Sequence, residues 1–327
     1  MLEQEATHIN MQEVVAGIDI GGTNTVIGIV TKSGQILSEH TIPTKCQTTF
    51  DGYIKNISTE IERLLTELEH EYTLKGVGIG APNGSYNLGA IVDAPNLDWK
   101  GILPICKEIT LNTGVPSVVT NDANAAALGE MLFGAAKEMK NFVVITLGTG
   151  LGSGIVIDGK LVVGHDGFAG EFGHVVAKID GRQCGCGKRG CLETYASATG
   201  IRRTAFKMLA DINQPSVLRN ITFEKLSAKM VTEAAKTGDP LARAAFEYTG
   251  LILGTRLADL VAILNPEAIF FFGGLANAGE LLFDPTRRHM EEYMFPVFRG
   301  KVKLLTSGLQ DKNAAVLGAA ALIWQEL

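Results

Sequence analysis

Residues 165–197 read HDGFAGEFGHVVAKIDGRQCGCGKRGCLETYAS, and this stretch holds three of the five cysteines of the chain. The three are Cys184, Cys186 and Cys191, and His174 precedes the first of them by ten positions. Three thiolates and one imidazole form a ligand set that zinc takes tetrahedrally, with no position left for water. The pattern therefore predicts a structural zinc site.

Two other interpretations of the cysteines remain open. They could be reduced, buried thiols beside an exposed glycine loop, or they could form a disulfide. A disulfide is disfavoured because Cys184 and Cys186 are separated by a single residue and the number of cysteines is odd. The acidic residues Glu171 and Glu193 bracket the cluster. A bound metal would hold both carboxylates near His174, which suits a surface that binds several hydroxyl groups.

The composition indicates a globular protein with room for two domains. The chain has 327 residues, of which 46% are hydrophobic and 20% charged. The net charge is −6 and no basic stretch alternates with aromatic residues, so we expect no nucleic-acid partner. The N-terminus is polar and acidic, without the apolar run of a signal peptide. We therefore expect a cytoplasmic protein that contacts no membrane.

The two halves of the chain begin alike. The apolar strand at 14–20 leads into a glycine turn and two further strands, and from residue 141 a strand, a second glycine turn and a hairpin follow. Helices are expected at about 50–69, 123–133, 193–211, 223–236, 240–264, 279–295 and 311–326, and further strands at 75–81, 117–120, 268–272 and 301–305. This order indicates an α/β protein that is duplicated at the level of architecture.

The duplication predicts two α/β lobes that face each other across a cleft. We expect the first lobe to span 1–120 and to be completed by the C-terminal helix 311–327. The second lobe would span 121–310, with the zinc-binding stretch 165–193 inserted. The chain would cross between the lobes near residues 120 and 308, at a hinge. Backbone N–H groups of the two glycine turns could then hold a ligand with several phosphates.

Three glycine turns are candidates for close contact with such a ligand. The first follows Asp19 and contains no lysine, so amides, the Thr23 hydroxyl and a metal ion near Asp19 would meet the phosphate charge. The third follows the strand 268–272 and could approach an adenosine. The alternative for each turn, taken alone, is an ordinary turn of the chain that binds no ligand. The turns consist of Gly21, Gly22 and Thr23, of Gly148, Thr149 and Gly150, and of Gly273 and Gly274.

The pair Asn121-Asp122 lies between the strand 117–120 and a helix. Phosphoryl transfer to an alcohol needs a carboxylate that accepts the hydroxyl proton, and Asp122 is the candidate for this base. Asn121 can both donate to and accept from a sugar hydroxyl. The alternative is that the pair only caps the helix that follows.

These motifs together resemble the ROK family of sugar kinases and transcriptional repressors. The resemblance runs in order from about residue 14 to 320. It rests on D-I-G-G-T at 19–23, N-D at 121–122, L-G-T-G-L-G-S-G at 147–154, G-E-F-G-H at 170–174 and C-x-C-G-x-x-G-C-x-E at 184–193. It implies an actin-like ATPase (ribonuclease H-like) fold of two duplicated α/β lobes around a cleft, with ATP and Mg²⁺ between them and a hexose in the cleft.

The resemblance also implies roles for individual residues. Asp122 is expected to be the catalytic base. The expected sugar contacts are Asn121, Asp122, Glu171, His174 and Glu193, and the expected zinc ligands are His174, Cys184, Cys186 and Cys191. The family usually has Gly-Pro-Gly where this chain has Ala81-Pro82-Asn83. Asn83 therefore either contacts the sugar or occupies a left-handed turn position.

The function that the resemblance implies is ATP-dependent phosphorylation of the 6-hydroxyl of glucose. N-acetylmannosamine, N-acetylglucosamine or fructose are alternative substrates. A sugar-responsive repressor is a further alternative from a different class. We disfavour it because about a dozen residues precede the first strand, which is too few for a helix-turn-helix module. We also expect a homo-oligomer, either a dimer or a tetramer.

Overall fold

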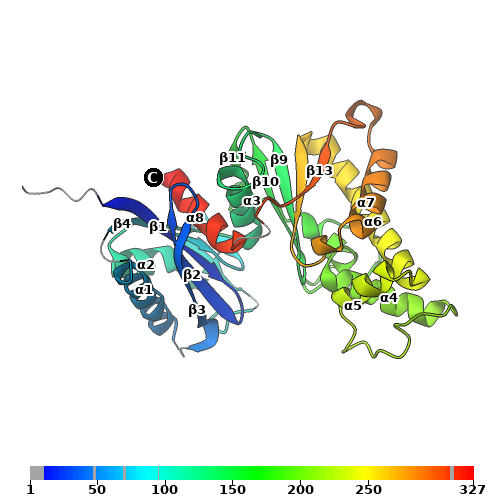
Figure 1. Ribbon diagram of the computed structural model, residues 1–327, viewed down its shortest axis with the longest axis horizontal. Helices are drawn as coiled ribbons and strands as arrows, with labels where there is room; N and C mark the ends of the chain where they lie inside the picture. The colour runs from blue at the N-terminus through cyan, green and yellow to red at the C-terminus, as the bar shows by residue number, and fades with distance from the viewer. Residues whose placement is uncertain (1–10, 47–48, 69–70, 95, 310–312) are drawn as a thin grey trace, which may run out of the picture. The chain divides into compact units, whose positions relative to one another are not determined.

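The computed structural model of the protein describes residues 11–46, 49–68, 71–94, 96–309 and 313–327. The chain forms two compact units (Figure 1). The first consists of Met1–Glu138, Val163–Phe168 and Leu309–Leu327, and the second of Met139–Val162 and Ala169–Gly308, as far as these ranges are described. Each unit is an α/β structure built on a five-stranded sheet, in agreement with the fold class expected from the sequence.

The boundary between the units lies at Glu138 and differs from the position near residue 120 that the sequence suggested. Helix α3 (Asp122–Leu132) belongs to the first unit because it packs closely on helix α8 (Ala314–Glu326). A Cβ atom at Gly318 of α8 would lie 2.3 Å from the carbonyl oxygen of Ala125 in α3. The chain also returns to the first unit at Val163–Phe168, which was not anticipated.

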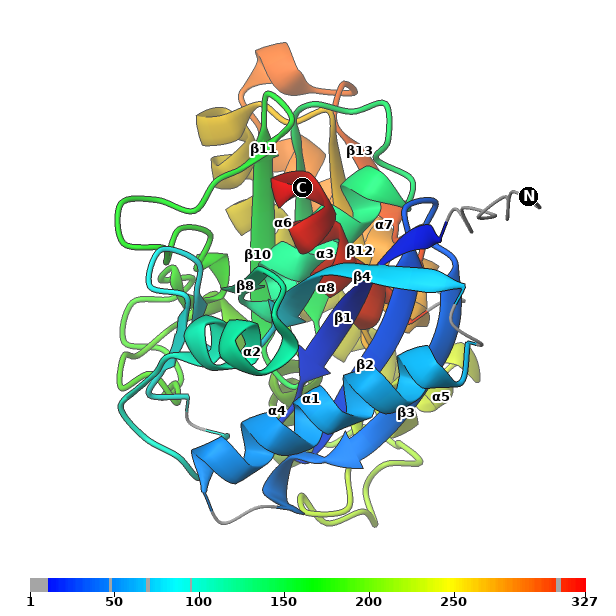
Figure 2. The ribbon, with the colours of Figure 1, turned by 90° about the vertical axis from the view of Figure 1, so that its left-hand side faces the viewer.

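The sheet of the first unit has the strand order β3-β2-β1-β4-β8. Strand β1 is antiparallel to β2 and parallel to β4, and β4 is parallel to β8. Helices α1 and α2 cover one face of the sheet, and α8 with α3 covers the other (Figure 2). The bounds are β1 Gln12–Ile20, β2 Asn24–Thr31, β3 Ile36–Pro43, β4 Tyr72–Gly80, β8 Ser117–Thr120, α1 Phe50–Thr66 and α2 Ile105–Thr113.

Glycines in the central strands let α8 approach the sheet closely. A Cβ atom at Gly17 in β1 would lie 2.3 Å from the carbonyl oxygen of Val316, and one at Gly78 in β4 would lie 1.8 Å from that of Ala319. Real Cβ atoms do not approach backbone oxygens so closely, so any larger residue here would push α8 away from the sheet. The glycines of the apolar strands therefore serve packing here, and only those in turns remain candidates for ligand contact.

The sheet of the second unit repeats the plan of the first. Its order is β11-β10-β9-β12-β13, with β9 antiparallel to β10 and parallel to β12. The architectural duplication predicted from the sequence is therefore present. The bounds are β9 Phe142–Leu147, β10 Leu151–Ile157, β11 Lys160–Leu161, β12 Ala268–Phe272, β13 Lys303–Thr306, α4 Ala198–Asp211, α5 Ala228–Lys236, α6 Pro240–Leu264 and α7 Glu280–Tyr293.

Some elements differ from expectation. Helix α4 was expected from about residue 193 but begins at Ala198, because Ser197 accepts a hydrogen bond from Gly200 N at 2.9 Å and so caps the helix there. Helix α2 was not anticipated, nor was the small sheet of β5 (Gly84–Ser85), β6 (Ala90–Val92) and β7 (Ile102–Leu103). Short 3₁₀ helices occur at Thr44–Cys46, Phe172–His174, Leu192–Thr194, Ala276–Ala278 and Pro296–Phe298.

Parts of two expected helices, residue 69 and residues 311–312, lie outside the described residues, as do the first ten residues of the acidic N-terminal segment. Within the described part of the chain, no helix combines the length and the apolar character that crossing a membrane requires.

Candidate active site

The sequence-predicted residues of the first unit gather at one edge of its sheet. Strands β1, β4 and β8 are parallel neighbours, so their carboxyl ends lie at the same edge. Asp19 is the penultimate residue of β1, Asn83 follows β4, and Asn121 and Asp122 follow β8 directly. The carboxyl edge of parallel strands is where α/β proteins commonly bind their ligands.

Asn121 and Asp122 form the N-terminus of helix α3. Asn121 Oδ1 accepts a hydrogen bond from Asn124 N at 2.7 Å, and Asp122 Oδ1 accepts one from Ala123 N at 2.9 Å. The capping role that the sequence left open is therefore present. The Asp122 carboxylate also accepts from its own backbone N–H, and its side chain remains exposed. The Asn121 amide group is not used by the cap and can take a further partner.

The negative charge of Asp122 acts on the carboxyl group of Asp19. Burial and, second, the negative charge of Asp122 raise the pKa of Asp19 to about 6. The Asp122 side chain is reached by solvent, yet the protein that surrounds it raises its pKa as well, and the hydrogen bond from Ala123 N opposes this rise. Two carboxylates that repel each other are a favourable place for a cation or for a proton in transfer.

The glycine turn between β1 and β2 is constrained by its neighbours. Gly21 N donates to Asn24 O at 2.9 Å, and Thr44 Oγ1 donates to Gly21 O at 2.7 Å. A Cβ atom at Gly22 would lie 2.9 Å from the Cβ of Asn96, so a larger residue does not fit. The Thr23 side chain is exposed. The turn therefore has a fixed backbone and presents one free hydroxyl side chain.

Asn83 occupies a left-handed turn position, with φ of 52°. Its Nδ2 atom donates to Val92 O at 3.0 Å, which ties the turn after β4 to the small sheet. Of the two roles that the sequence left open for Asn83, the turn position is the one that its own backbone adopts. A sugar contact through its remaining Oδ1 atom stays a prediction.

The glycine turns of the second unit also adjoin each other. Gly148–Gly150 joins β9 to β10, and Gly273-Gly274 follows β12, the neighbour of β9. Gly273 has φ of 101°, and a Cβ there would lie 2.8 Å from Leu147 O, so this position requires glycine. Chain neighbours aside, no atom of the described residues lies within 4 Å of a Cβ placed at Gly148 or at Gly274. Both turns thus have open space beside them, although the Gly148 N–H itself donates to Gly150 O at 3.1 Å.

Glu193 connects the second glycine turn with the cysteine cluster. Its Oε2 atom accepts a hydrogen bond from Leu151 N at 3.2 Å, and its Oε1 atom lies 3.5 Å from Cys184 Sγ. A Cβ atom at Gly150 would lie 2.1 Å from Glu193 Oε2, so only glycine fits there. The half-buried Glu193 carboxylate is therefore fixed by the turn on one side and by a cluster thiol on the other.

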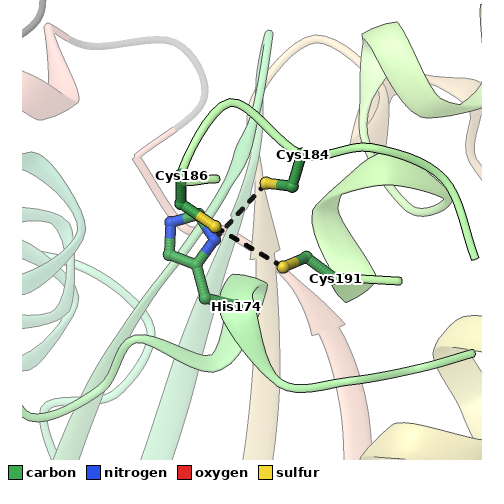
Figure 3. A group of neighbouring side chains, drawn as sticks. All are labelled: His174, Cys184, Cys186 and Cys191. Carbon is green, nitrogen blue, oxygen red and sulfur yellow. Dashed lines mark hydrogen bonds between the residues drawn. The ribbon is translucent and has the colours of Figure 1, made fainter. Parts of the chain in front are cut away.

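The four predicted metal ligands point toward one another (Figure 3). The ligand atoms of His174, Cys184, Cys186 and Cys191 lie within 4.8 Å of one another. Cys186 Sγ lies 3.7 Å from Cys191 Sγ, and Cys184 Sγ lies 3.8 Å from His174 Nδ1. With Zn–S bonds of about 2.3 Å, a tetrahedral site has sulfur atoms about 3.8 Å apart. The donor set and its spacing therefore fit a zinc ion.

The histidine ring has two distinct sides. His174 Nδ1 faces the cysteine cluster, and Nε2 lies 3.9 Å from Glu171 Oε2. A metal ion on Nδ1 would leave the proton on Nε2 and fix its direction. Glu171 is exposed, whereas Glu193 is half-buried. His174, Glu171 and Glu193 therefore lie around the same cluster, as the sequence predicted.

One residue at this edge was missed by the sequence reasoning. The Asn124 side chain is 1% exposed, its Nδ2 donates to Thr120 Oγ1 at 3.2 Å, and its Oδ1 is buried without a hydrogen-bond partner among the described residues. A polar residue inside the alanine-rich run 123–133 was the signal that could have identified it.

Two α/β units with duplicated sheets and with glycine turns after β1, β9 and β12 have the architecture of a phosphate-binding α/β protein. The family model described as "ROK family" matches residues 15–326, and the chain belongs to the ROK family.

Relatives in this family include kinases and repressors. The chain is 37% identical to a glucokinase of Thermotoga maritima over 95% of this chain and 97% of the relative. A solved ROK family glucokinase from Streptomyces griseus, in complex with glucose and AMPPNP, is 36% identical and superimposes with a TM-score of 0.77 over 95% of this chain and 99% of that chain. A xylose repressor of Caldicellulosiruptor bescii is 28% identical over 96% of this chain and 78% of the relative.

Proposed function

We propose that the protein is an ATP-dependent hexose kinase that transfers the γ-phosphoryl group of ATP to the 6-hydroxyl of glucose. The observation that carries the proposal is the position of Asp122, whose exposed carboxylate lies at the carboxyl edge of the first sheet and acts electrostatically on Asp19. The similarity to glucokinases over nearly their whole length supports the same activity.

Asp122 acts as the general base in this proposal. It accepts the proton of the 6-hydroxyl as that oxygen bonds to the γ-phosphorus, while the bond between the γ-phosphorus and the bridging oxygen breaks and ADP leaves. The raised pKa of Asp122 suits this role, because a more basic carboxylate takes the proton more readily once it is ionised. Asn121 orients the sugar through its free amide group.

The glycine turns bind the phosphates. The turn at Gly274, which has open space beside its backbone, and the exposed Thr23 hydroxyl offer hydrogen-bond donors of the kind that phosphates need. Asp19 is the residue that would hold Mg²⁺, and the ion, when bound, neutralises charge on the phosphates. An aspartate with a raised pKa binds such a cation with release of a proton.

The cysteine cluster fixes the sugar-binding residues of the second unit. A zinc ion held by His174, Cys184, Cys186 and Cys191 would be structural, since all four positions are protein ligands. The His174 Nε2 proton and the carboxylates of Glu171 and Glu193 then have fixed directions for vicinal hydroxyl groups. Asn83 is a further candidate for sugar contact.

The test is a coupled assay of ADP release with glucose, fructose, N-acetylglucosamine and N-acetylmannosamine as acceptors. We expect the highest kcat/KM with glucose, and a product phosphorylated at O6 by ³¹P and ¹H NMR. A preference for an N-acetylhexosamine or fructose would correct the substrate. The absence of ADP release with every hexose, in the presence of ATP and Mg²⁺, would contradict the kinase assignment and favour a sugar-binding role such as that of the repressors.

A further inference from the structure

The second unit carries a surface cavity of about 870 Å³ that none of the residues discussed above lines. It lies between helix α4 and the segment 219–224, and Arg182, which precedes the cysteine loop, forms one side. Neither the glycine turns nor the metal ligands belong to its wall. The cavity is therefore separate from the candidate active site.

Basic side chains dominate this wall in a chain whose net charge is −6. The Arg182 guanidinium donates to the carbonyl oxygens of Thr194 and Gly200 at 2.7 and 3.0 Å, and Arg203 donates to that of Gln183 at 3.1 Å. These acceptors are neutral. Among the described residues, no carboxylate lies within ion-pair distance of either arginine, so their charges remain uncompensated.

Two more basic residues, Arg219 and Lys207, line the cavity. Arg219 donates from Nε to the carbonyl oxygen of Gln214 at 2.7 Å, from Nη1 to that of Leu209 at 2.9 Å and from Nη2 to those of Ile212 and Gln214. These acceptors are neutral, so Arg219 keeps its charge although most of its N–H groups are already used. Lys207 is paired with Asp211, which lies outside the lining residues. Of the described residues that line the cavity, Glu224 is the only acidic one. With Lys207 balanced by Asp211, three arginines face one lining carboxylate, which gives the cavity a positive potential that would attract an anion.

The same cavity has an aromatic surface. The rings of Phe206 and Phe223 lie 5.2 Å apart at 63°, and Phe206 is 39% exposed. Arg202 stacks on Phe223, with its guanidinium carbon 4.4 Å from the ring centroid, and its buried Nε has no hydrogen-bond partner in the part of the chain that the structure describes. An exposed ring beside fixed guanidinium groups suits a ligand that has both a planar ring and a negative charge.

We propose that this cavity is a second nucleotide site, which binds a nucleoside phosphate with its phosphates on Arg203 and Lys207, in the positive potential of Arg182 and Arg219, and its base against Phe206. Arginine side chains already held by backbone carbonyls lose little freedom on binding, and guanidinium groups match phosphate oxygens geometrically. The volume also suffices for such a ligand, since small-molecule pockets commonly measure about 300–1,000 Å³. This inference goes beyond the proposed kinase function.

The test is equilibrium dialysis of labelled ADP against the full-length wild type and against the double variant Arg203→Gln/Lys207→Gln. We expect two ADP per chain for the wild type and one for the double variant. The control is Lys236→Gln on α5, which also removes a lysine paired with a nearby acid on the same helix, and which should keep two. Melting temperatures of all proteins establish that the variants fold.

The outcomes separate the two proposals. One ADP per chain in both the wild type and the double variant would overturn the second site and leave the kinase site standing. One ADP in the wild type and none in the double variant would support the cavity and contradict the proposed active-site nucleotide. No ADP in any protein would overturn both.

A competition arm tests the class of ligand. AMP should displace ADP from the second site about tenfold more effectively than inorganic phosphate or adenosine alone, because each of these offers only one of the two contacts. Phe206→Ala should abolish this advantage of AMP over phosphate. Equal displacement by phosphate and AMP in the wild type would reduce the cavity to a simple anion site and overturn the nucleotide assignment.

Discussion

Glu193 Oε2 accepts a hydrogen bond from Leu151 N at 3.2 Å, and this contact joins the loop of the cysteine cluster to the second glycine turn. The other carboxylate oxygen lies 3.5 Å from Cys184 Sγ. In the second unit, Glu193 therefore contacts both the loop expected to bind sugar and the turn expected to bind phosphate. A substitution in the glycine turn should therefore alter the position of the Glu193 carboxylate beside the cysteine cluster.

Gly150→Ala tests this connection. The new Cβ would meet Glu193 Oε2 at 2.1 Å, so the carboxylate must leave its place, and we expect a loss of about 1–3 kcal/mol in the free energy of unfolding. Gly148→Ala is the matched control, because no atom lies within 4 Å of its Cβ. Thermal denaturation without ligands measures both. Equal melting temperatures for the two variants would show that the Glu193 contact is dispensable.

Asp122→Asn tests the base. An asparagine oxygen can still accept the hydrogen bond from Ala123 N, so the helix should persist while the proton acceptor is lost. We expect kcat to fall by about 10²–10⁴-fold with little change in glucose affinity. Steady-state kinetics and calorimetry measure the two quantities. Asp51→Asn, in the first turn of α1, is the control and should keep full turnover. Near-normal turnover of the Asp122 variant would remove it from the mechanism.

Asp19→Asn should change how stability depends on pH. In the folded state the carboxyl keeps its proton up to about pH 6, whereas the unfolded chain releases it near the ordinary value of 3.8. The folded state binds more protons in this window, so the free energy of unfolding of the wild type falls as pH rises through it.

The Asp19→Asn variant has no carboxyl group at this position, so its free energy of unfolding does not fall in this way. Its stability advantage over the wild type should grow from pH 4 to pH 6.5 and then stay constant, with an upper limit of roughly 3 kcal/mol that solvent screening reduces. Chemical denaturation of both proteins, without Mg²⁺ and nucleotide, measures this difference in the free energy of unfolding at each pH. A difference that is independent of pH would mean that Asp19 titrates normally.

Cys186→Ser tests the metal cluster. We expect about one zinc per chain in the wild type and a loss of zinc together with weaker glucose binding in the variant, because the metal fixes the His174 ring. Elemental analysis and glucose titration measure the two effects. Cys106→Ser, a cysteine of the first unit outside the cluster, is the control and should retain zinc. A metal-free wild type with full glucose affinity would refute the role of the metal.

The elements that the sequence predicted well are those with local signals. Strand β8 has the expected bounds, and α6 and β12 also agree, because their apolar runs end at turn or capping residues. Helix α2 was missed since only Ile105 and Ile109 are buried on it, too few to give a clear period. The boundary near residue 120 was misplaced because α3 packs on α8, which lies nearly two hundred residues further along the chain.

The sequence by itself determined the ligand set of the metal cluster and the duplicated order of strands and turns. These features depend on residues close together in the chain, such as the three cysteines within 184–191. The tertiary structure alone decided which distant groups meet. Asp19 and Asp122 become electrostatic neighbours because β4 lies between β1 and β8 in one sheet, and Glu193 reaches Leu151 because the cysteine loop folds back on β10. Such pairings follow from strand order and packing, and no local pattern of residues encodes them.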